Sequence, residues 1–429
     1  MSFIRSFSIT FASKAFSLIL LLICRILTAR LLGPSDLGVY GSALNLATIL
    51  SRWGSMGTVP ATQLIISQNP LSKNQILTFI LLASWVLGIA NILIIYAFQE
   101  IIMTWQFPGS LAAFKLFKKL YLFLPVILLS MMLPIYLLGL SQYRNYALTQ
   151  IIPLCVQVSI ILSASEMSEN NRIVVVAQLA SWLTTVLISI VLIGFRNFHF
   201  EFSRSLFIKF THLSIAMWPL IIIQFGLSRF AILIGSHSLS AVELGQYFLA
   251  SNLSEAYFFI HASLAPIILN QSGADKPHIN FLVRSLRFGN LLLIISLTIT
   301  ILIGRQPFLY FFGDDYAGSW KLFLLLIPNV LFHGMVSVFI HHLLARGKKQ
   351  IALIFQLTSL VILVLSSFLL CPLYGASGLC VASFISSFCA WLCYLLKIKY
   401  DTNRMLSIGA LWIPTSEDWN YLKNLRKVI

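Results

Sequence analysis

Charged residues are scarce in this chain, and acidic residues are the scarcest of them. Only 10% of the 429 residues are charged, with 13 Asp and Glu against 29 Lys and Arg. Soluble globular domains carry roughly a quarter charged residues, so this composition excludes a soluble globular protein. Apolar residues take the place of the missing charge, since 59% of the chain is hydrophobic and the mean hydropathy is +0.90.

Long polar segments and paired cysteines are also missing. The longest stretches between apolar segments, near 100–115 and 305–319, leave no room for a separate catalytic domain. The six cysteines fall within or at the edge of apolar segments, where a cysteine usually serves as a small buried hydrophobe. The pattern predicts no disulfide framework, no metal site and no cofactor, and it gives no catalytic residue. We therefore expect a protein that is not an enzyme.

Apolar segments of about 20 residues recur along the whole chain, which is the length that crosses a bilayer core of ~30 Å. They predict an all-α polytopic membrane protein with about 12 transmembrane helices. The predicted spans lie near 7–31, 37–66, 76–99, 116–141, 146–164, 173–194, 207–234, 241–269, 285–304, 320–344, 351–371 and 375–396.

The basic residues outside these spans predict the orientation. Most of them fall on the side that holds both ends of the chain, and the positive-inside rule places that side in the cytoplasm. Residues 398–429 form a basic tail with Trp412, Trp419 and Tyr421. Such a tail suits the surface of the inner leaflet, and a disordered tail is the alternative.

A weak internal repeat predicts two halves. The sequence DLGVYGSALNL (36–46) resembles ELGQYFLASNL (243–253), and each stands at the start of a span in the corresponding position. We expect two six-helix lobes, 1–200 and 201–397. Because six is even, both lobes enter the membrane the same way, so the pseudo-two-fold axis runs along the membrane normal with a central cleft.

Basic residues inside the spans predict what this cleft binds. Lys14, Arg25, Arg52 and Arg229 lie within apolar segments, where a charge costs on the order of 2.5–3.5 kcal/mol by insertion scales. Helical spacing places Lys14 with Arg25, and Asn45 with Arg52, on shared faces. Snorkelling to the membrane surface is the alternative for some of them. A cationic cleft that binds an anion, such as a diphosphate held by guanidinium groups, explains them better.

Residues near Arg52 predict an interrupted helix. Gly54, Gly57 and Pro60 follow it, and such residues weaken or kink a helix so that its backbone can line a cavity.

Glu255 is the one clear acid within a predicted span, and an ion pair with Arg52 is one role that the sequence allows. A carboxyl at this depth is also a candidate proton carrier, and a static ion pair is the alternative. Polar side chains that could contact a glycan are Asn45, Gln150, Gln157 and Gln224.

Three segments resemble a known family. They are ILTARLLGPSDLGVYGSALNLATIL near the N-terminus, FFGDDYAGSWKLFLLLIPNVLF with LLARGKKQ near 311–350, and CPLYGASGLCVASFIS at 371–386. They look like the polysaccharide-transporter branch of the multidrug/oligosaccharidyl-lipid/polysaccharide exporter superfamily. Many relatives have Asp-Arg where this chain has Ser228-Arg229, so a role for that pair does not transfer directly.

The resemblance implies a flippase of the bacterial cytoplasmic membrane. Such a protein moves an undecaprenyl-diphosphate-linked oligosaccharide, such as an O-antigen repeat unit for lipopolysaccharide, from the inner to the outer leaflet by alternating access. Arg25 and Arg52 match the places of cavity arginines on helices one and two. The implied partners are this lipid-linked glycan, membrane lipids, a polysaccharide polymerase and chain-length proteins, with no nucleic acid and a monomeric transporter.

Two other functions stay open from the sequence. A multidrug exporter of the same superfamily is one, although exporters of organic cations favour acidic cavities. A membrane polysaccharide polymerase or glycosyltransferase is the other, and it would need acidic groups or a large outer loop that this sequence supports only thinly.

Overall fold

The structure is a computed structural model of the chain. It describes residues 3–68, 72–107, 110–163, 170–194, 200–262, 279–346, 348–402, 411–412 and 415–418. In the first helix, side chains are described from residue 15 onwards.

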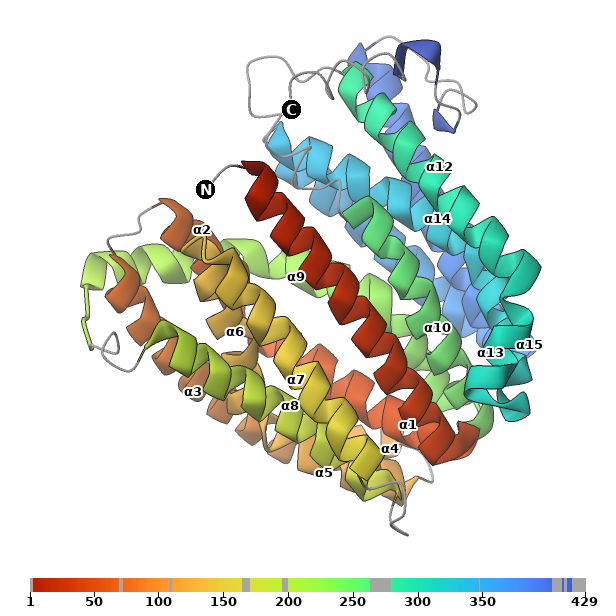
Figure 1. The fold of residues 1–429 in the computed structure, drawn as a ribbon, viewed down its shortest axis with the longest axis horizontal. Coiled ribbons are helices and arrows are strands. Elements are labelled where there is room, and N and C mark those ends of the chain that lie inside the picture. Colours follow the sequence, from red (N-terminus) through yellow and green to blue (C-terminus); the bar gives the residue numbers. More distant parts are fainter. Residues whose placement is uncertain are drawn as a thin grey trace. The chain divides into compact units, whose positions relative to one another are not determined.

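The described residues form helices and no strands (Figure 1). The helices are α1 (Phe3–Gly54), α2 (Thr58–Gln68), α3 (Lys73–Ala97), α4 (Gln99–Gln106), α5 (Leu111–Tyr121), α6 (Leu124–Gly139), α7 (Tyr143–Ser163), α8 (Asn170–Ile193), α9 (Arg204–Ser238), α10 (Ala241–Ala262), α12 (Ile279–Ile303), α13 (Arg305–Phe312), α14 (Ala317–Ala345) and α15 (Lys349–Thr402), with a 3-10 turn at Asp314–Tyr316.

The described parts of the predicted spans fall on these helices, with the span 37–66 broken between α1 and α2 and residues 263–269 of the span 241–269 outside the described residues. This confirms the all-α membrane class. Among the described residues, 8 helices are long and apolar enough to cross a membrane, or 9 if α5 and α6 form one bent span. Two of them, α1 and α15, each cover two predicted spans and are interrupted at Gly33 and Gly375. Both glycines have positive φ, 68° and 58°, which L side chains rarely adopt. Dividing these two helices at their glycines, and including the more polar α10, leads to about twelve spans.

Three details differ from the sequence-based expectation. The predicted span 116–141 is bent by 54° between α5 and α6. The longest predicted loops contain the short helices α4 and α13. Of the six cysteines, which are all free thiols, Cys155 is exposed on α7 rather than buried. A side chain that faces lipid can be apolar without being covered by protein, because the bilayer itself is the apolar solvent.

The chain divides into two compact units, Met1–Gly245 and Gln246–Ile429. In the first unit, α1 packs against α5, α7 and α9, while α6 packs against α2, α3 and α8. In the second unit, α14 packs against α12 and α15. Helix α9, which the repeat assigns to the second lobe, thus packs with the helices of the first unit. The lobe boundary at 200/201 is inferred from the sequence repeat, and it stays a prediction.

The expected position of the C-terminal tail on the leaflet surface stays a prediction, and its described residues pack within the second unit. Leu411 is fully buried in a cluster that includes Leu286 of α12 and Trp391 and Ile398 of α15. Helix α15 extends to Thr402, past the predicted lobe end at 397, and its residue Ile398 packs in this cluster.

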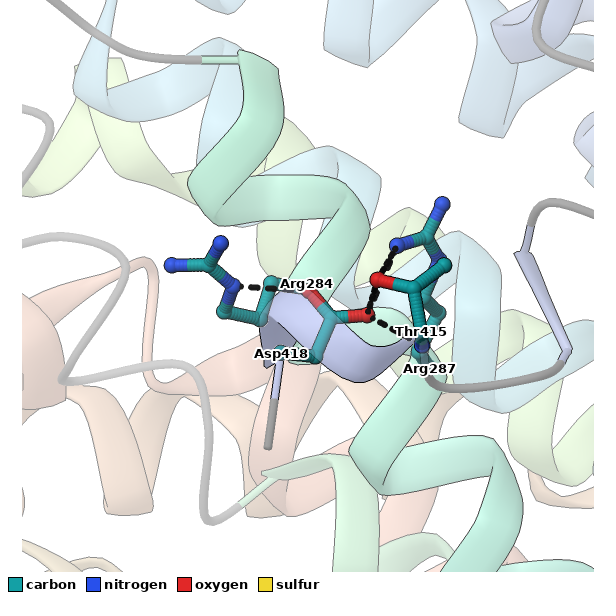
Figure 2. A network of polar contacts seen from close by, with 4 residues as sticks. All are labelled: Arg284, Arg287, Thr415 and Asp418. Atoms are coloured by element: carbon teal, nitrogen blue, oxygen red, sulfur yellow. Dashed lines mark hydrogen bonds and ion pairs between the residues drawn. The ribbon is translucent and has the colours of Figure 1, made fainter. Parts of the chain in front are cut away.

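Polar contacts hold the tail to α12. Asn290 donates from Nδ2 to the Leu411 carbonyl oxygen at 2.9 Å. Asp418 accepts from Arg284 Nε at 2.8 Å, from Arg287 Nη1 at 2.7 Å and from the Thr415 backbone N–H at 2.8 Å (Figure 2). A carboxylate with three such donors is well satisfied, so the buried Asp418 holds the described part of the tail against α12.

Candidate functional site

Two of the predicted cations meet at one aromatic ring in the first unit. The Arg52 guanidinium carbon lies 5.7 Å from the centre of the Phe225 ring, and that of Arg229 lies 6.0 Å from the same centre. Phe225 and Arg229 are four residues apart on α9, so they share a helix face, and Arg52 reaches them from α1. Both distances are at the range where a cation is attracted to a ring face.

Arg52 has an unused hydrogen-bonding group in this site. Its Nε atom is buried and has no hydrogen-bond partner, and no ion pair to Arg52 is found within the described part of the chain. A positive charge in an apolar surrounding is costly unless it is paired. The cation–π contact offsets part of that cost, because such contacts contribute about 0.5–1 kcal/mol at exposed sites and about 2 kcal/mol or more when desolvated.

Asn45 connects the two helices beside the arginines. It donates from Nδ2 to the Arg229 carbonyl oxygen at 3.3 Å, while its Oδ1 is buried without a partner. The Trp53 Nε1 atom is likewise buried and unbonded. Buried polar atoms in native proteins are nearly always hydrogen-bonded. Unsatisfied atoms of Asn45, Arg52 and Trp53 on one helical segment are therefore typical of a site that binds a polar ligand.

The helix break that follows Arg52 is confirmed. Helix α1 ends at Gly54 and α2 begins at Thr58, with Met56 and Gly57 at φ 46° and 78°. A Cβ on Gly57 would overlap the Ser214 carbonyl oxygen of α9, so only glycine fits this close approach.

Side chains donate to carbonyl groups at this break, in addition to the bond from the Met56 N–H to the Trp53 carbonyl oxygen at 3.1 Å. Trp218 Nε1 donates to the Trp53 carbonyl oxygen at 2.7 Å, and Asn91 Nδ2 donates to that of Gly54 at 3.3 Å. Ser55 Oγ donates to the Arg52 carbonyl oxygen at 2.7 Å. Backbone groups inside a membrane must find internal partners. The break is thus a fixed structural feature, and it holds Arg52 in the last turn of α1, where the helix dipole favours a cation.

A second polar cluster surrounds Gln178 of α8. Its Oε1 accepts from Gln157 Nε2 of α7 at 3.1 Å and from the Tyr40 hydroxyl of α1 at 3.5 Å. Arg25 is half-buried in the first half of α1. Gln157 belongs to this cluster, and its buried side chain already uses its amide group there.

The other predicted residues have different surroundings. Gln150 is half-buried on α7, and Gln224 is exposed on α9. Glu255 is half-buried on α10 in the second unit. Lys14 belongs to α1 by its backbone, but its side chain lies outside the described residues.

Sequence reasoning missed the aromatic residues of the site. Phe225 could have been found because it stands four residues before Arg229, the spacing that places a ring beside a cation on a helix. Tyr40 belongs to the repeated Leu-Gly-x-Tyr motif. Trp218 and Asn91 had no signal in the sequence, since their partners are backbone atoms of another helix.

The described carboxylates do not form a candidate metal site. Asp314 and Asp315 lie in the 3-10 turn, and no three His, Cys, Asp or Glu side chains of the described ranges could hold a metal ion together.

Comparison with known proteins shows the fold. No protein-family model matches this sequence, and no curated protein sequence matches it. Solved structures do match. One is lipid II flippase MurJ in an inward closed conformation, with 15% identity over 94% of this chain and 88% of that chain, and a TM-score of 0.77. This chain has the fold of that transporter.

Two further structures extend the same likeness. An inward-facing multidrug resistance MATE family transporter of the MOP superfamily has 12% identity, covers 92% of this chain with 100% of its own, and has a TM-score of 0.73. A MOP superfamily transporter from Pyrococcus furiosus Vc1, described by a reverse polarity of its binding pocket, has 14% identity, coverage of 92% and 95%, and a TM-score of 0.59. The shared two-lobe helical fold agrees with the repeat found in the sequence.

Proposed function

We propose that this chain is a flippase for an undecaprenyl-diphosphate-linked oligosaccharide in the bacterial cytoplasmic membrane. It moves this lipid from the inner to the outer leaflet by alternating access, both of its termini are cytoplasmic, and it has no enzymatic activity. The convergence of Arg52 and Arg229 on Phe225 is the observation that supports this proposal most directly.

Two guanidinium groups at one ring suit a diphosphate. Like charges repel strongly where the dielectric constant is low, so an anion with two phosphate groups stabilises both cations at once. Guanidinium groups bind phosphate oxygens through two parallel hydrogen bonds, and Arg52 has a buried Nε atom for this purpose. Asn45 Oδ1 can accept a hydrogen bond from a sugar hydroxyl next to the phosphate.

The remaining predicted residues have roles in the same proposal. Arg25 forms a further binding site for the diphosphate on α1. Lys14 binds the phosphates first. Gln150, Gln157 and Gln224 are glycan contacts, although Gln157 would first have to leave Gln178.

The alternatives fit these contacts less well. An exporter of cationic drugs has the fold in its favour, since a MATE family transporter shares it. Paired arginines, however, repel a cationic drug. A polymerase or glycosyltransferase would need carboxyl groups near the bound lipid, whereas the side-chain contacts of Arg52 described above are with an aromatic ring that it shares with a second arginine.

Binding of undecaprenyl diphosphate to the protein in nanodiscs tests this proposal. Replacing Arg52 by Ala removes charged hydrogen bonds worth roughly 1.5–3 kcal/mol, so we expect a dissociation constant about 10–100 times higher. Arg52→Lys keeps the charge without the planar fork and should lose less. Arg305→Ala, on α13, is the control for a general loss of positive charge. Unchanged binding in Arg52→Ala would contradict the diphosphate site.

Complementation connects binding to transport. In a strain that lacks its flippase, Arg52→Ala at matched protein level should give almost no surface glycan, while lipid-linked units accumulate inside. If unpolymerised units reached the outer surface instead, a polymerase would be the better description.

A further inference from the structure

The first unit has an apolar groove that the proposed diphosphate site does not include. It encloses about 350 Å³ between the first half of α3, the first half of α9 and the break between α1 and α2. Phe79, Leu82 and Val86 line it from α3, and Phe207 and Ile215 line it from α9.

The groove offers hydrocarbon contacts and little else. Of its polar lining residues, Thr58 and Ser214 use their hydroxyl groups on the carbonyl oxygens of Ser55 and Phe210, at 2.7 and 2.8 Å. Transfer of a polar solute into such a lining would cost the hydrogen bonds it makes in water. An aliphatic chain loses none, so the chemistry of the groove selects a hydrocarbon.

Aromatic contacts and hydrogen bonds fix the shape of the groove. The Phe79 ring lies 5.7 Å from Phe202, 5.4 Å from Phe207 and 5.8 Å from Phe210. Asn74 of α3 donates to the Glu201 carboxylate at 2.7 Å, which ties the segment before α9 to α3. A lining held in this way is largely formed before a ligand arrives.

One side of the groove is open. Leu82 is 44% exposed, Val86 is 63% exposed and Ile215 is 52% exposed, and all three lie on helices long and apolar enough to span the membrane. A hydrocarbon chain of a lipid can therefore enter the groove laterally from the bilayer without passing through water. A volume of about 350 Å³ is at the lower end for small-molecule pockets, so it holds a segment of a long chain.

The groove and the arginine site are neighbours along the chain on both walls. Met56 lines its wall and stands four residues after Arg52, in the break itself. On the other wall, Trp218 follows Ile215 by less than one helical turn and donates to the carbonyl oxygen of Trp53. A lipid with its head group at Arg52 would thus place the start of its chain at the groove.

We propose that this groove binds the first segment of the polyprenyl chain of the substrate while the diphosphate is held at Arg52. This assignment rests on the proposed function and adds a separate site to it. The protein thereby holds the part of the polyprenyl chain nearest the head group, and only the distal part of the polyprenyl chain lies in the bilayer.

Photo-crosslinking identifies the occupant. The photoreactive residue p-benzoylphenylalanine replaces Leu82 at the groove, or Leu93, which is 62% exposed on the same helix but does not line the groove. In nanodiscs of phosphatidylethanolamine and phosphatidylglycerol with undecaprenyl diphosphate, position 82 should give a polyprenyl adduct at least five times as abundant as position 93. Phospholipid adducts alone at position 82, or equal polyprenyl adducts at both positions, would overturn the proposal.

A substitution that fills the groove tests the polyprenyl site independently of the diphosphate site. Ala83 lines the groove and Ala97 lies exposed at the end of the same helix, so Ala83→Phe and Ala97→Phe are matched. We expect Ala83→Phe to raise the dissociation constant for undecaprenyl diphosphate about tenfold. Its constant for dimethylallyl diphosphate, whose chain is too short to fill the groove, should not change.

The same binding measurements distinguish a failure of the groove proposal from a failure of the proposed diphosphate site. If Arg52→Ala weakens both ligands and Ala83→Phe weakens neither, the groove proposal is wrong and the proposed function stands. If Arg52→Ala weakens neither ligand, the diphosphate site is wrong. An Ala83→Phe protein that binds both ligands equally weakly would show damage to the arginine site and would also contradict a separate chain site.

Discussion

Gly38 and Gly245 lie at a reciprocal backbone crossing within the first unit. A Cβ on Gly38 would overlap the Ala241 carbonyl oxygen, and a Cβ on Gly245 would overlap the Pro34 carbonyl oxygen. These are the matching glycines of the two Leu-Gly-x-Tyr motifs, and each meets the residue four positions before the other. The glycine of the repeated motif therefore has a physical cause. In each copy, the absence of a side chain allows the backbone of the other copy to approach closely.

The crossing predicts a strong effect of small substitutions. Gly38→Ala and Gly245→Ala should each destabilise the protein by about 1–3 kcal/mol, because backbone atoms cannot move aside as a side chain can. The measurement is the melting temperature of the detergent-solubilised protein. Gly139→Ala is the control, since its Cβ would approach Ile66 Cβ only to 3.1 Å, which needs a much smaller shift than an overlap with a carbonyl oxygen. Equal melting temperatures for Gly38→Ala and the wild type would contradict the crossing.

The capped helix break predicts a role for the indole N–H of Trp218. Trp218→Phe keeps an aromatic ring but leaves the Trp53 carbonyl oxygen without its 2.7 Å donor, so we expect about 1 kcal/mol less stability. Undecaprenyl diphosphate binding should also weaken, since Arg52 precedes that carbonyl by one residue. Trp85→Phe on the exposed side of α3 should change neither property. Full stability and full binding in Trp218→Phe would show that the break is held by other contacts.

The anchored tail predicts a dependence on pH. Burial by itself raises the pKa of Asp418, but hydrogen bonds from Arg284, the Thr415 backbone and Arg287 outweigh it and lower the pKa well below its usual range. The carboxylate therefore stabilises the tail above about pH 4, the ordinary value for aspartate, and this contribution is lost as the pH falls toward the native pKa.

Hydrogen exchange of the peptide that contains Asp418 checks this dependence. At pH 7, Asp418→Asn should exchange faster than the wild type, and the difference should shrink below about pH 4. Glu417→Gln, at the exposed neighbouring position, should exchange like the wild type at pH 7. Equal exchange for Asp418→Asn and the wild type at pH 7 would mean that Leu411 alone holds the tail.

Glu255 is the candidate for coupling to protons. A carboxyl group on an apolar helix can take up a proton when its surroundings change, so Glu255→Gln should make transport in vesicles independent of a proton gradient. Glu243→Gln on the same helix, where the carboxylate accepts from Ser240 at 2.9 Å, is the control. Unchanged gradient dependence in Glu255→Gln would remove this residue from the mechanism and favour the static ion pair.

Local composition determined the class of this protein. The free energy of moving a helix into a bilayer depends on the residues of that helix, so hydropathy predicts the helices on which the described parts of the spans lie. Glycine and proline likewise act through their own backbone restrictions. For this reason the sequence predicts the break after Arg52, and the structure places it at residues 55–57.

Tertiary packing decided which polar groups meet. Nothing local to Arg52 shows that it shares Phe225 with Arg229, that Gln157 bonds to Gln178, or that Trp218 caps α1. The groove between α3 and α9 and the docking of Asp418 on α12 depend on the same long-range packing. Hydropathy fixes that a helix is in the membrane but not its rotation about its own axis, and that rotation, set by side-chain packing between helices, decides which cations converge.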